Sequence, residues 1–392
     1  MDSGVPNTVA PLLINLKEEL AKATDAILAC GAPSETAVQV QVRLNAFLRK
    51  AAPGLPVPKE PAVYDEKAVD DSLKPVKGQF GNEVKAEVTK FSGPPLLLKV
   101  ILSNDVTCGD DSQLLIYRQK GGRWVRTLRW SSDFDQGKGS GGGYYASYGA
   151  AWGDFFFTQV LVADPAHPDD WRAIVAHGTP WCSSRMSGFG MAVLAPDATP
   201  NGRSVWQTDR GYSRADFSPK LRVSGDTFEL RLHADEMEFD PDSGYERLVI
   251  YRYRVSGGDV TRLEPVAAHA RGFVDEWLSM PFTEALDQSD SSQTDVLRSV
   301  HKQYETSHAE SSDEYTSWHS GPMQACSAKG RFQVEMDTEH NRMVPGKPGG
   351  ETTPGPTYYF QLQQDNGYRL LAITKKPDPT CTGPDLMQKT SR

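Results

Sequence analysis

Alternating apolar and polar positions recur in four stretches of the chain, each with a glycine near its middle. They are residues 114–130, 190–208, 248–265 and 358–374. The first and third are the most alike, since Leu-Leu-Ile-Tyr-Arg matches Leu-Val-Ile-Tyr-Arg and both continue to Gly-Gly. Period-two runs on either side of Gly-Gly or Asn-Gly predict β-hairpins, because these residues reach the positive φ of a tight turn. The sequence therefore predicts four hairpins.

Two more strand-like runs precede each hairpin, which gives four successive sets of four short strands. A small isolated sheet leaves both faces open, and radial stacking of neighbouring sheets covers them. We therefore predict a mainly β chain with a propeller-like arrangement of about four small antiparallel sheets. The alternative is a β-sandwich over residues 83–268 followed by a separate C-terminal α+β domain.

Helical periodicity flanks the β signal. Leucines recur at helical spacing in residues 9–52, and Gly31-Ala32-Pro33 separates two helices there. The predicted organisation is a helical hairpin in 1–52, a Pro-rich linker or strap in 53–82, three four-stranded β repeats in 83–268, a helical insertion in 269–312, a fourth β repeat or small α+β domain in 313–381, and a tail in 382–392. The apolar faces of the helices are expected to pack on the β domain, with a partner helix as the alternative.

The net charge restricts the classes of partner that the protein is expected to bind. The formal net charge is −9, whereas nucleic acids and anionic membranes are bound by clustered cations. No apolar run reaches the roughly 20 residues that cross a bilayer. We therefore expect no nucleic-acid partner and no transmembrane segment, and a neutral or cationic small molecule, saccharide or protein as partner.

The compartment follows less directly from the sequence. The first residues lack the basic and long apolar regions of a signal peptide, which fits either a cytoplasmic protein or a mature secreted chain. Abundant Gly and Pro and long polar loops favour a periplasmic or secreted protein of bacterial type, with a cytoplasmic one as the alternative. Of five cysteines, Cys108 with Cys182 and Cys326 with Cys381 are the candidate disulfides. Independent buried thiols are the alternative.

Strand reversal predicts where unusual residues gather. Loops that follow the second strand of each set, and loops that join the sets, should open on one face. These loops are residues 103–112, 177–188, 234–245, 131–153 and 209–219. Converging loops on a rigid scaffold are the usual place for a binding surface.

Aromatic and charged side chains in these loops are the candidate ligand-binding residues. Aromatics beside glycine suit stacking on sugar rings or flat ligands. The candidates are Tyr144, Tyr145, Tyr148, Trp152, Trp181, Arg185, Asp209, Arg210 and Arg214. Packing of the aromatics between neighbouring sheets is the alternative.

The sequence also offers candidates for a catalytic site and for a metal site. If the chain is an enzyme, His177 with Asp110 or Asp216 would supply the acid and base, and Arg185 would bind an anionic group. Asp240, Asp242 and Glu246 surround Gly244 and are candidates for Ca²⁺, with a solvated acidic turn as the alternative. No cofactor is predicted, and no complete catalytic motif is present.

Three functions remain open from the sequence. The leading hypothesis is an extracytoplasmic β-rich protein that binds an unknown ligand with the loop face. The second is a hydrolase acting on a saccharide or peptide by His/carboxylate acid-base chemistry. The third is an assembly or scaffold protein that docks through its N-terminal helices.

Overall fold

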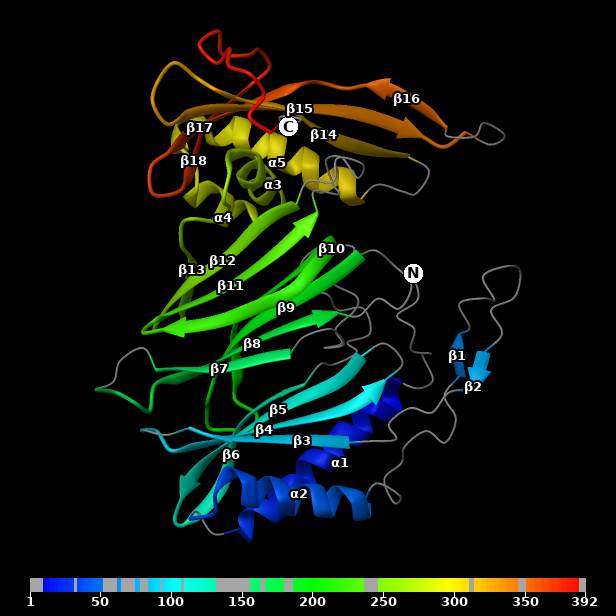
Figure 1. Cartoon of the computed structure of the whole chain (residues 1–392), viewed down its shortest axis with the longest axis vertical. Helices are drawn as coiled ribbons and strands as arrows, with labels where there is room; N and C mark the ends of the chain where they lie inside the picture. The colour runs from blue at the N-terminus through cyan, green and yellow to red at the C-terminus, as the bar shows by residue number, and fades with distance from the viewer. Residues whose placement is uncertain are drawn as a thin grey trace, which may run out of the picture.

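The structure is a computed structural model of the whole chain, mainly β, with four antiparallel sheets and a pair of N-terminal helices (Figure 1). It describes residues 10–31, 34–51, 62–64, 75–77, 84–91, 94–106, 109–131, 156–162, 166–179, 186–235, 246–309, 314–344 and 350–387.

The N-terminal helices cover one face of a four-stranded sheet. Helices α1 (Ala10–Ala29) and α2 (Ala37–Ala51) lie against strands β3 (Val84–Lys90), β4 (Leu97–Val106), β5 (Gly109–Lys120) and β6 (Arg123–Ser131). Leu16, Leu20 and Leu44 are buried there against the sheet residues Val100 and Leu115. The spacing of the leucines thus forms an amphipathic pair whose apolar faces the sheet buries, as predicted.

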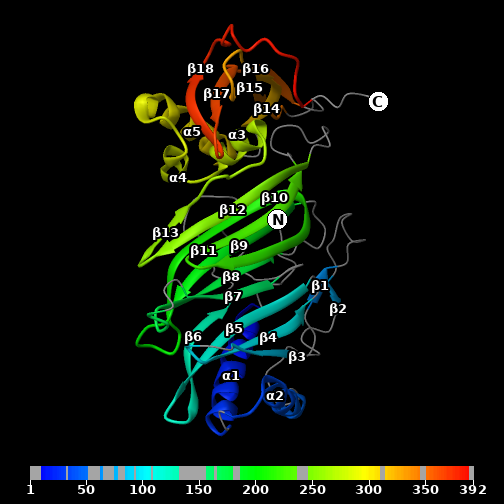
Figure 2. The same cartoon turned by 60° about the vertical axis from the view of Figure 1, so that its left-hand side comes forward.

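Strand β4 is apolar on both faces because both are covered. Leu98 and Val100 point toward the helices, whereas Leu97 and Ile101 pack against Trp171 of the neighbouring sheet. The side-chain period of two therefore makes the four-stranded sheet the middle layer between the helices and the second sheet. Figure 2 shows this order from the side.

The central sheet has seven strands in sequence order. They are β7 (Phe156–Val162), β8 (Trp171–Thr179), β9 (Met186–Ala195), β10 (Arg203–Ser224), β11 (Thr227–Asp235), β12 (Glu246–Ser256) and β13 (Asp259–Arg262). The first part of β10 pairs with β9 and the second part with β11, and the register shifts after Ser213. The two halves of the sheet share one apolar core, in which Met191 and Val193 meet Phe228 and Tyr253. The sheet therefore folds back on itself at β10.

The seven-stranded sheet differs from the separate four-stranded repeats that the sequence predicts. The second and third sets of strands are not separate units, because β10 serves both of them and residues 209–219 continue the strand instead of forming a connecting loop. A propeller-like closure is not confirmed. Residues 84–262 form packed sheets and a C-terminal α+β unit follows, which is closer to the predicted alternative.

The C-terminal unit places helices on one face of a five-stranded sheet. The helices are α3 (Ala270–Ser279), α4 (Phe282–Asp287), the 3₁₀ turn η3 (Ser291–Gln293) and α5 (Thr294–Ala309). The strands are β14 (Glu314–Ala325), β15 (Arg331–Arg342), β16 (Glu351–Pro354), β17 (Tyr358–Gln364) and β18 (Tyr368–Thr374). Phe273 and Trp277 of α3 are fully buried against Val334 and Phe360 of the sheet.

The Pro-rich segment contains a short ribbon. Strands β1 (Ala62–Tyr64) and β2 (Pro75–Lys77) pair antiparallel within the predicted linker. The four predicted hairpins are present as β5–β6, β9–β10, β12–β13 and β17–β18. Gly121 and Gly122 turn the first of them with φ of 55° and 76°, as the Gly-Gly signal requires.

Candidate functional site

Several strand ends meet on one side of the molecule. We name this place the strand-end rim. It comprises the ends of strands at Val106, Gly109, Ser131, Phe156, Thr179, Met186, Asp235 and Glu246, and the fold of β10 at Ser213. The arrowheads of β4, β8 and β11 point to the same side in Figure 1.

The pairing register aligns two predicted positions, His177 and Asp209, across the rim. His177 on β8 pairs with Gly190 on β9, and Gly190 pairs with Asp209 on β10. Ser213, four residues further along β10, pairs with both Met186 and Asp235. The hairpins β8–β9 and β11–β12 therefore both end beside the fold of β10.

His177 packs against Trp130 at the rim. Its ring lies 5.0 Å from the ring of Trp130, measured between centroids, so the end of β6 meets the end of β8. Only 9% of His177 is exposed. A base that acts on a bound substrate has to reach it within hydrogen-bond distance. His177 therefore fits a packing role between the two sheets better than a role as an exposed base.

The positions Asp209, Arg210, Arg214 and Asp216 belong to β10 and not to a loop. The strand is irregular there, with register shifts between Ser213 and Asp216 and between Asp216 and Lys220. A β-bulge bends a strand and increases its local twist. The predicted loop is therefore a bent strand, and its candidate residues still lie at the rim.

The other predicted ligand-binding residues lie outside the described residues. They are Tyr144, Tyr145, Tyr148, Trp152, Trp181 and Arg185, together with Cys108, Cys182, Asp240 and Asp242. Asp110 occupies the second position of β5, opposite Asp105, and Glu246 is the first residue of β12.

Sequence reasoning missed a second polar surface, on the C-terminal sheet. Val334 and Met336 of β15 face the helices, and the alternate residues Glu335, Asp337 and Glu339 lie on the opposite face. We name these three residues the acidic ladder. The period-two pattern of the segment RFQVEMDTE carries the signal for it.

Each residue of the acidic ladder has a polar neighbour. Asp337 accepts a hydrogen bond from the Thr357 hydroxyl at 2.5 Å, and the Tyr359 hydroxyl donates to Glu335. His319 Nε2 lies 3.4 Å from a Glu339 oxygen. Burial and the nearby Asp337 raise the pKa of Glu335, although the bond from Tyr359 opposes this shift. The ladder thus holds a carboxyl group that protonates more readily than a free one.

One predicted cysteine pair is present. Cys326 and Cys381 form a disulfide with an S–S distance of 1.99 Å, which ties the chain after β18 to the end of β14. Cys30 is exposed and has a free thiol.

The described residues contain neither a cluster of metal-ligating side chains nor a helix that could span a membrane. Nowhere in these ranges do three His, Cys, Asp or Glu side chains come together as metal ligands would. None of the helices in the same ranges combines the length and the apolar character that spanning a membrane requires.

No known family model matches the sequence. A comparison with curated proteins finds no match either. A functional assignment therefore depends on the chemistry of the rim and the acidic ladder.

Proposed function

We propose that the chain is an extracytoplasmic binding protein of bacterial type, and that the strand-end rim holds a neutral or cationic ligand of the saccharide class. The observation that carries the proposal is the contact of Trp130 with His177 at the ends of two different sheets. It supports a rim to which both sheets contribute. In the sequence, the predicted aromatic and arginine positions follow β6 and β8 or lie within β10 near its fold.

The electrostatics favour a neutral or cationic ligand. The net charge is −9, and acidic residues outnumber basic ones along the chain. Aromatic side chains give a large contact area at low entropic cost, which suits the faces of sugar rings. The Cys326–Cys381 disulfide adds support for an oxidising compartment, where such bonds persist.

The burial of His177 weighs against the hydrolase alternative. Acid-base hydrolysis at the rim would require His177 beside Asp110 or Asp216, with its ring open to the substrate. The ring is instead packed on Trp130. Binding therefore has more support than catalysis at this place.

A saccharide panel tests the proposal. Neutral and amino sugars, as mono- and oligosaccharides, would be screened by thermal shift, and positive members measured by calorimetry. We expect Tyr145→Ala to weaken binding at least tenfold, and Arg210→Ala to do so for the neutral sugars, whose hydroxyl groups accept hydrogen bonds from a guanidinium. Arg222→Ala is the matched control, because Arg222 is exposed near the far end of β10.

Two results would contradict the proposal. One is a panel in which no saccharide raises the melting temperature. The other is binding that survives both rim substitutions unchanged. Cell fractionation of a tagged full-length chain tests the compartment separately, and recovery from the cytoplasm alone would refute the extracytoplasmic part.

A further inference from the structure

Helix α2 carries apolar residues on two opposite faces. Val40, Leu44 and Leu48 are buried against the four-stranded sheet and α1. Val38 and Val42, on the outer face, are 70% and 64% exposed. A surface helix normally presents polar side chains to solvent, so the outer face of α2 is the exception.

The two exposed valines form one stripe with Ala46. Residues four apart lie on the same side of a helix, and Ala46 is exposed as well. The other large exposed apolar residues in the described ranges are Val125, Val296, Tyr315, Met343 and Leu386. Among the described residues, each of these five is the only large exposed apolar residue on its segment. Helix α2 differs because it carries two of them, four residues apart.

We infer that this stripe pairs with the same stripe of a second copy, with the two α2 helices antiparallel and crossing at Val42. In that arrangement residue 38 of one copy faces residue 46 of the other, and residue 35 faces residue 49. Such a contact is isologous, because each copy contributes the same surface.

The ends of α2 carry opposite charges, which favours the antiparallel direction. Glu35 precedes the helix, and Arg49 and Lys50 occupy its last turn in the sequence. Antiparallel pairing brings the cationic end of one copy beside Glu35 of the other, and it also opposes the two helix dipoles favourably. Within its own chain Glu35 pairs with Arg43 at 2.7 Å, so that a cation from the second copy would join an existing pair.

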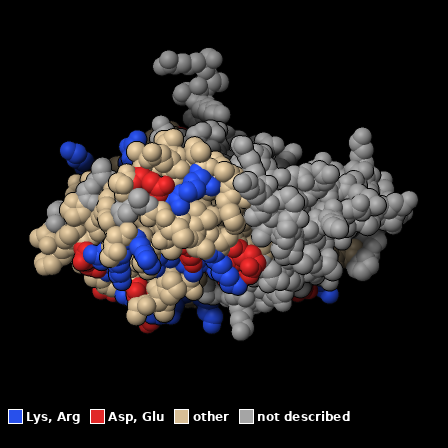
Figure 3. Space-filling model, turned by 90° about the horizontal axis from the view of Figure 1, so that it is seen from below, with Lys and Arg blue, Asp and Glu red and all other residues tan. Residues whose placement is uncertain are grey.

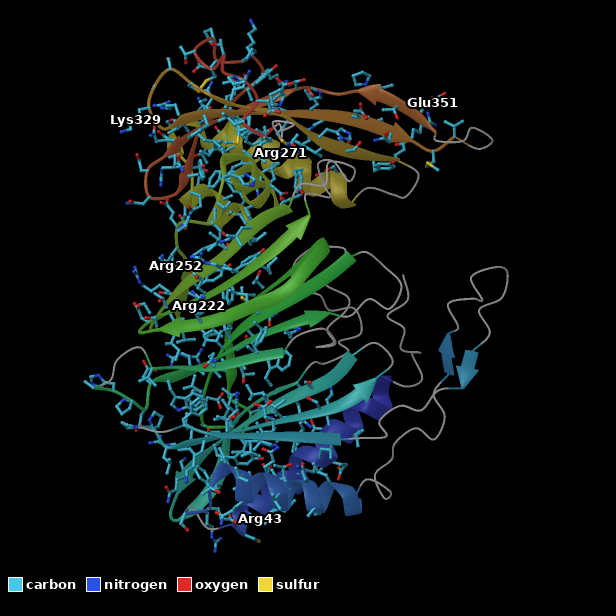
Figure 4. The ribbon with its side chains drawn as sticks, viewed as in Figure 1. Arg43, Arg222, Arg252, Arg271, Lys329 and Glu351 are labelled. Carbon is cyan, nitrogen blue, oxygen red and sulfur yellow. A yellow bond between two sulfur atoms is a disulfide. The ribbon has the colours of Figure 1, made fainter. Side chains whose placement is uncertain are left out.

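The surroundings fit a protein partner better than a membrane. The described part of the underside, where α1 and α2 lie, shows Lys, Arg, Asp and Glu interspersed (Figure 3). Interfacial helices instead combine a large apolar face with cations. Arg43, labelled in Figure 4, lies at this end of the molecule. One 15-residue helix per copy is a small interface, so the dimer is expected to be weak and reversible.

Sedimentation velocity over a concentration series of the full chain tests the pairing. The parent is Cys30→Ser, which removes the exposed thiol. We expect the mean mass to rise toward that of a dimer with concentration, and the double variant Val38→Glu/Val42→Glu to stay monomeric. Val296→Glu is the matched control, an exposed valine (45%) on α5, and should behave like the parent.

Cysteine cross-linking tests whether the partner of the stripe is the same stripe of a second copy. On mild oxidation Val42→Cys should form a covalent dimer, because the crossing point faces itself, whereas Val296→Cys and the parent should not. A mixture of Val38→Cys and Ala46→Cys chains should cross-link better than either alone. A parent that is monomeric at every concentration overturns the inference. Association that survives Val38→Glu/Val42→Glu, or failure of Val42→Cys to cross-link, also overturns it.

Discussion

The guanidinium of Arg262 lies 2.8 Å from the carboxylate of Glu276, and both side chains are at least 99% buried. Arg262 ends β13 and Glu276 lies in α3, so this pair joins the central sheet to the C-terminal unit. Burial alone would lower the pKa of Arg262, but electrostatic interactions with Tyr253, Glu276 and Glu284 raise it above its ordinary value. The guanidinium also lies over the ring of Tyr251. The junction is therefore a fixed ionic contact inside an apolar layer.

We expect Glu276→Gln to reduce the free energy of unfolding by at most about 3 to 5 kcal/mol, because it removes the nearer carboxylate from the buried charge of Arg262 and leaves only Glu284, at 3.7 Å. The double variant Arg262→Met/Glu276→Leu should cost less than the single one, since it removes both charges. Denaturant unfolding measures the differences. Glu229→Gln is the control, because it breaks a pair with Arg231, whose side chain is 49% exposed, and such a pair near the surface is worth about 1 kcal/mol or less. Equal losses at the two pairs would refute this account.

The Cys326–Cys381 disulfide closes a loop with a sequence separation of 55 residues. In the chain-entropy description, such a cross-link stabilises by restricting the unfolded chain. We expect Cys326→Ser/Cys381→Ser to lower the unfolding free energy of the C-terminal unit by about 2 to 4 kcal/mol. Cys30→Ser should leave it unchanged. Stability that does not differ between the two variants under oxidising conditions would contradict the prediction.

The hairpins were predictable because their signals are local. Gly121-Gly122 and Asn201-Gly202 sit between alternating runs, and both form turns. In contrast, local signals do not predict that the second and third sets of strands share β10. Residues 209–219 contain Gly211 and Pro219 and read as a loop, but pairing with β9 and β11 holds them in a strand. Pairing between distant segments overrides such local signals.

The position of the candidate site in the fold could be predicted in part. Antiparallel pairing places the ends of β8 and β11 beside the fold of β10, because strand reversal determines which ends are shared. The burial of His177 depends on Trp130, which is 47 residues earlier and in another sheet. The acidic ladder follows from the period-two pattern of β15 only once the face covered by the helices is known, because the sequence alone does not say which face of a strand is buried.

The raised pKa of Glu335 predicts a pH-dependent stability. A carboxyl group whose pKa is higher in the folded state stabilises the fold while it is protonated, and that contribution is lost as pH rises through the folded pKa. We expect Glu335→Gln to be more stable than wild type at neutral pH. The difference should disappear at pH values below the ordinary Glu pKa of about 4.3. Melting temperatures across a pH series measure it, with Glu314→Gln, an exposed residue of β14, as control.

Lys99 predicts the opposite dependence of stability on pH. It lies in the layer between the four-stranded and the seven-stranded sheet. It lies on β4 between Leu97 and Ile101, which belong to the apolar cluster there, and is only 9% exposed. Burial lowers the pKa of the Lys99 ammonium, and the charge of Glu87 offsets this only in part. The charged form is therefore held in the folded state at a cost.

We expect Lys99→Met to stabilise the protein at neutral pH, because it replaces a buried ammonium with an apolar side chain of similar length. The unfolded chain keeps a Lys pKa of about 10.4, so wild type should gain stability as pH rises from the lowered folded pKa toward that value. The advantage of Lys99→Met should shrink over the same interval. Lys120→Met, at an exposed position beside the β5–β6 turn, should show no such trend. Denaturant unfolding at neutral and alkaline pH measures both variants, and a loss of stability in Lys99→Met at neutral pH would mean that the ammonium contributes favourably where it lies.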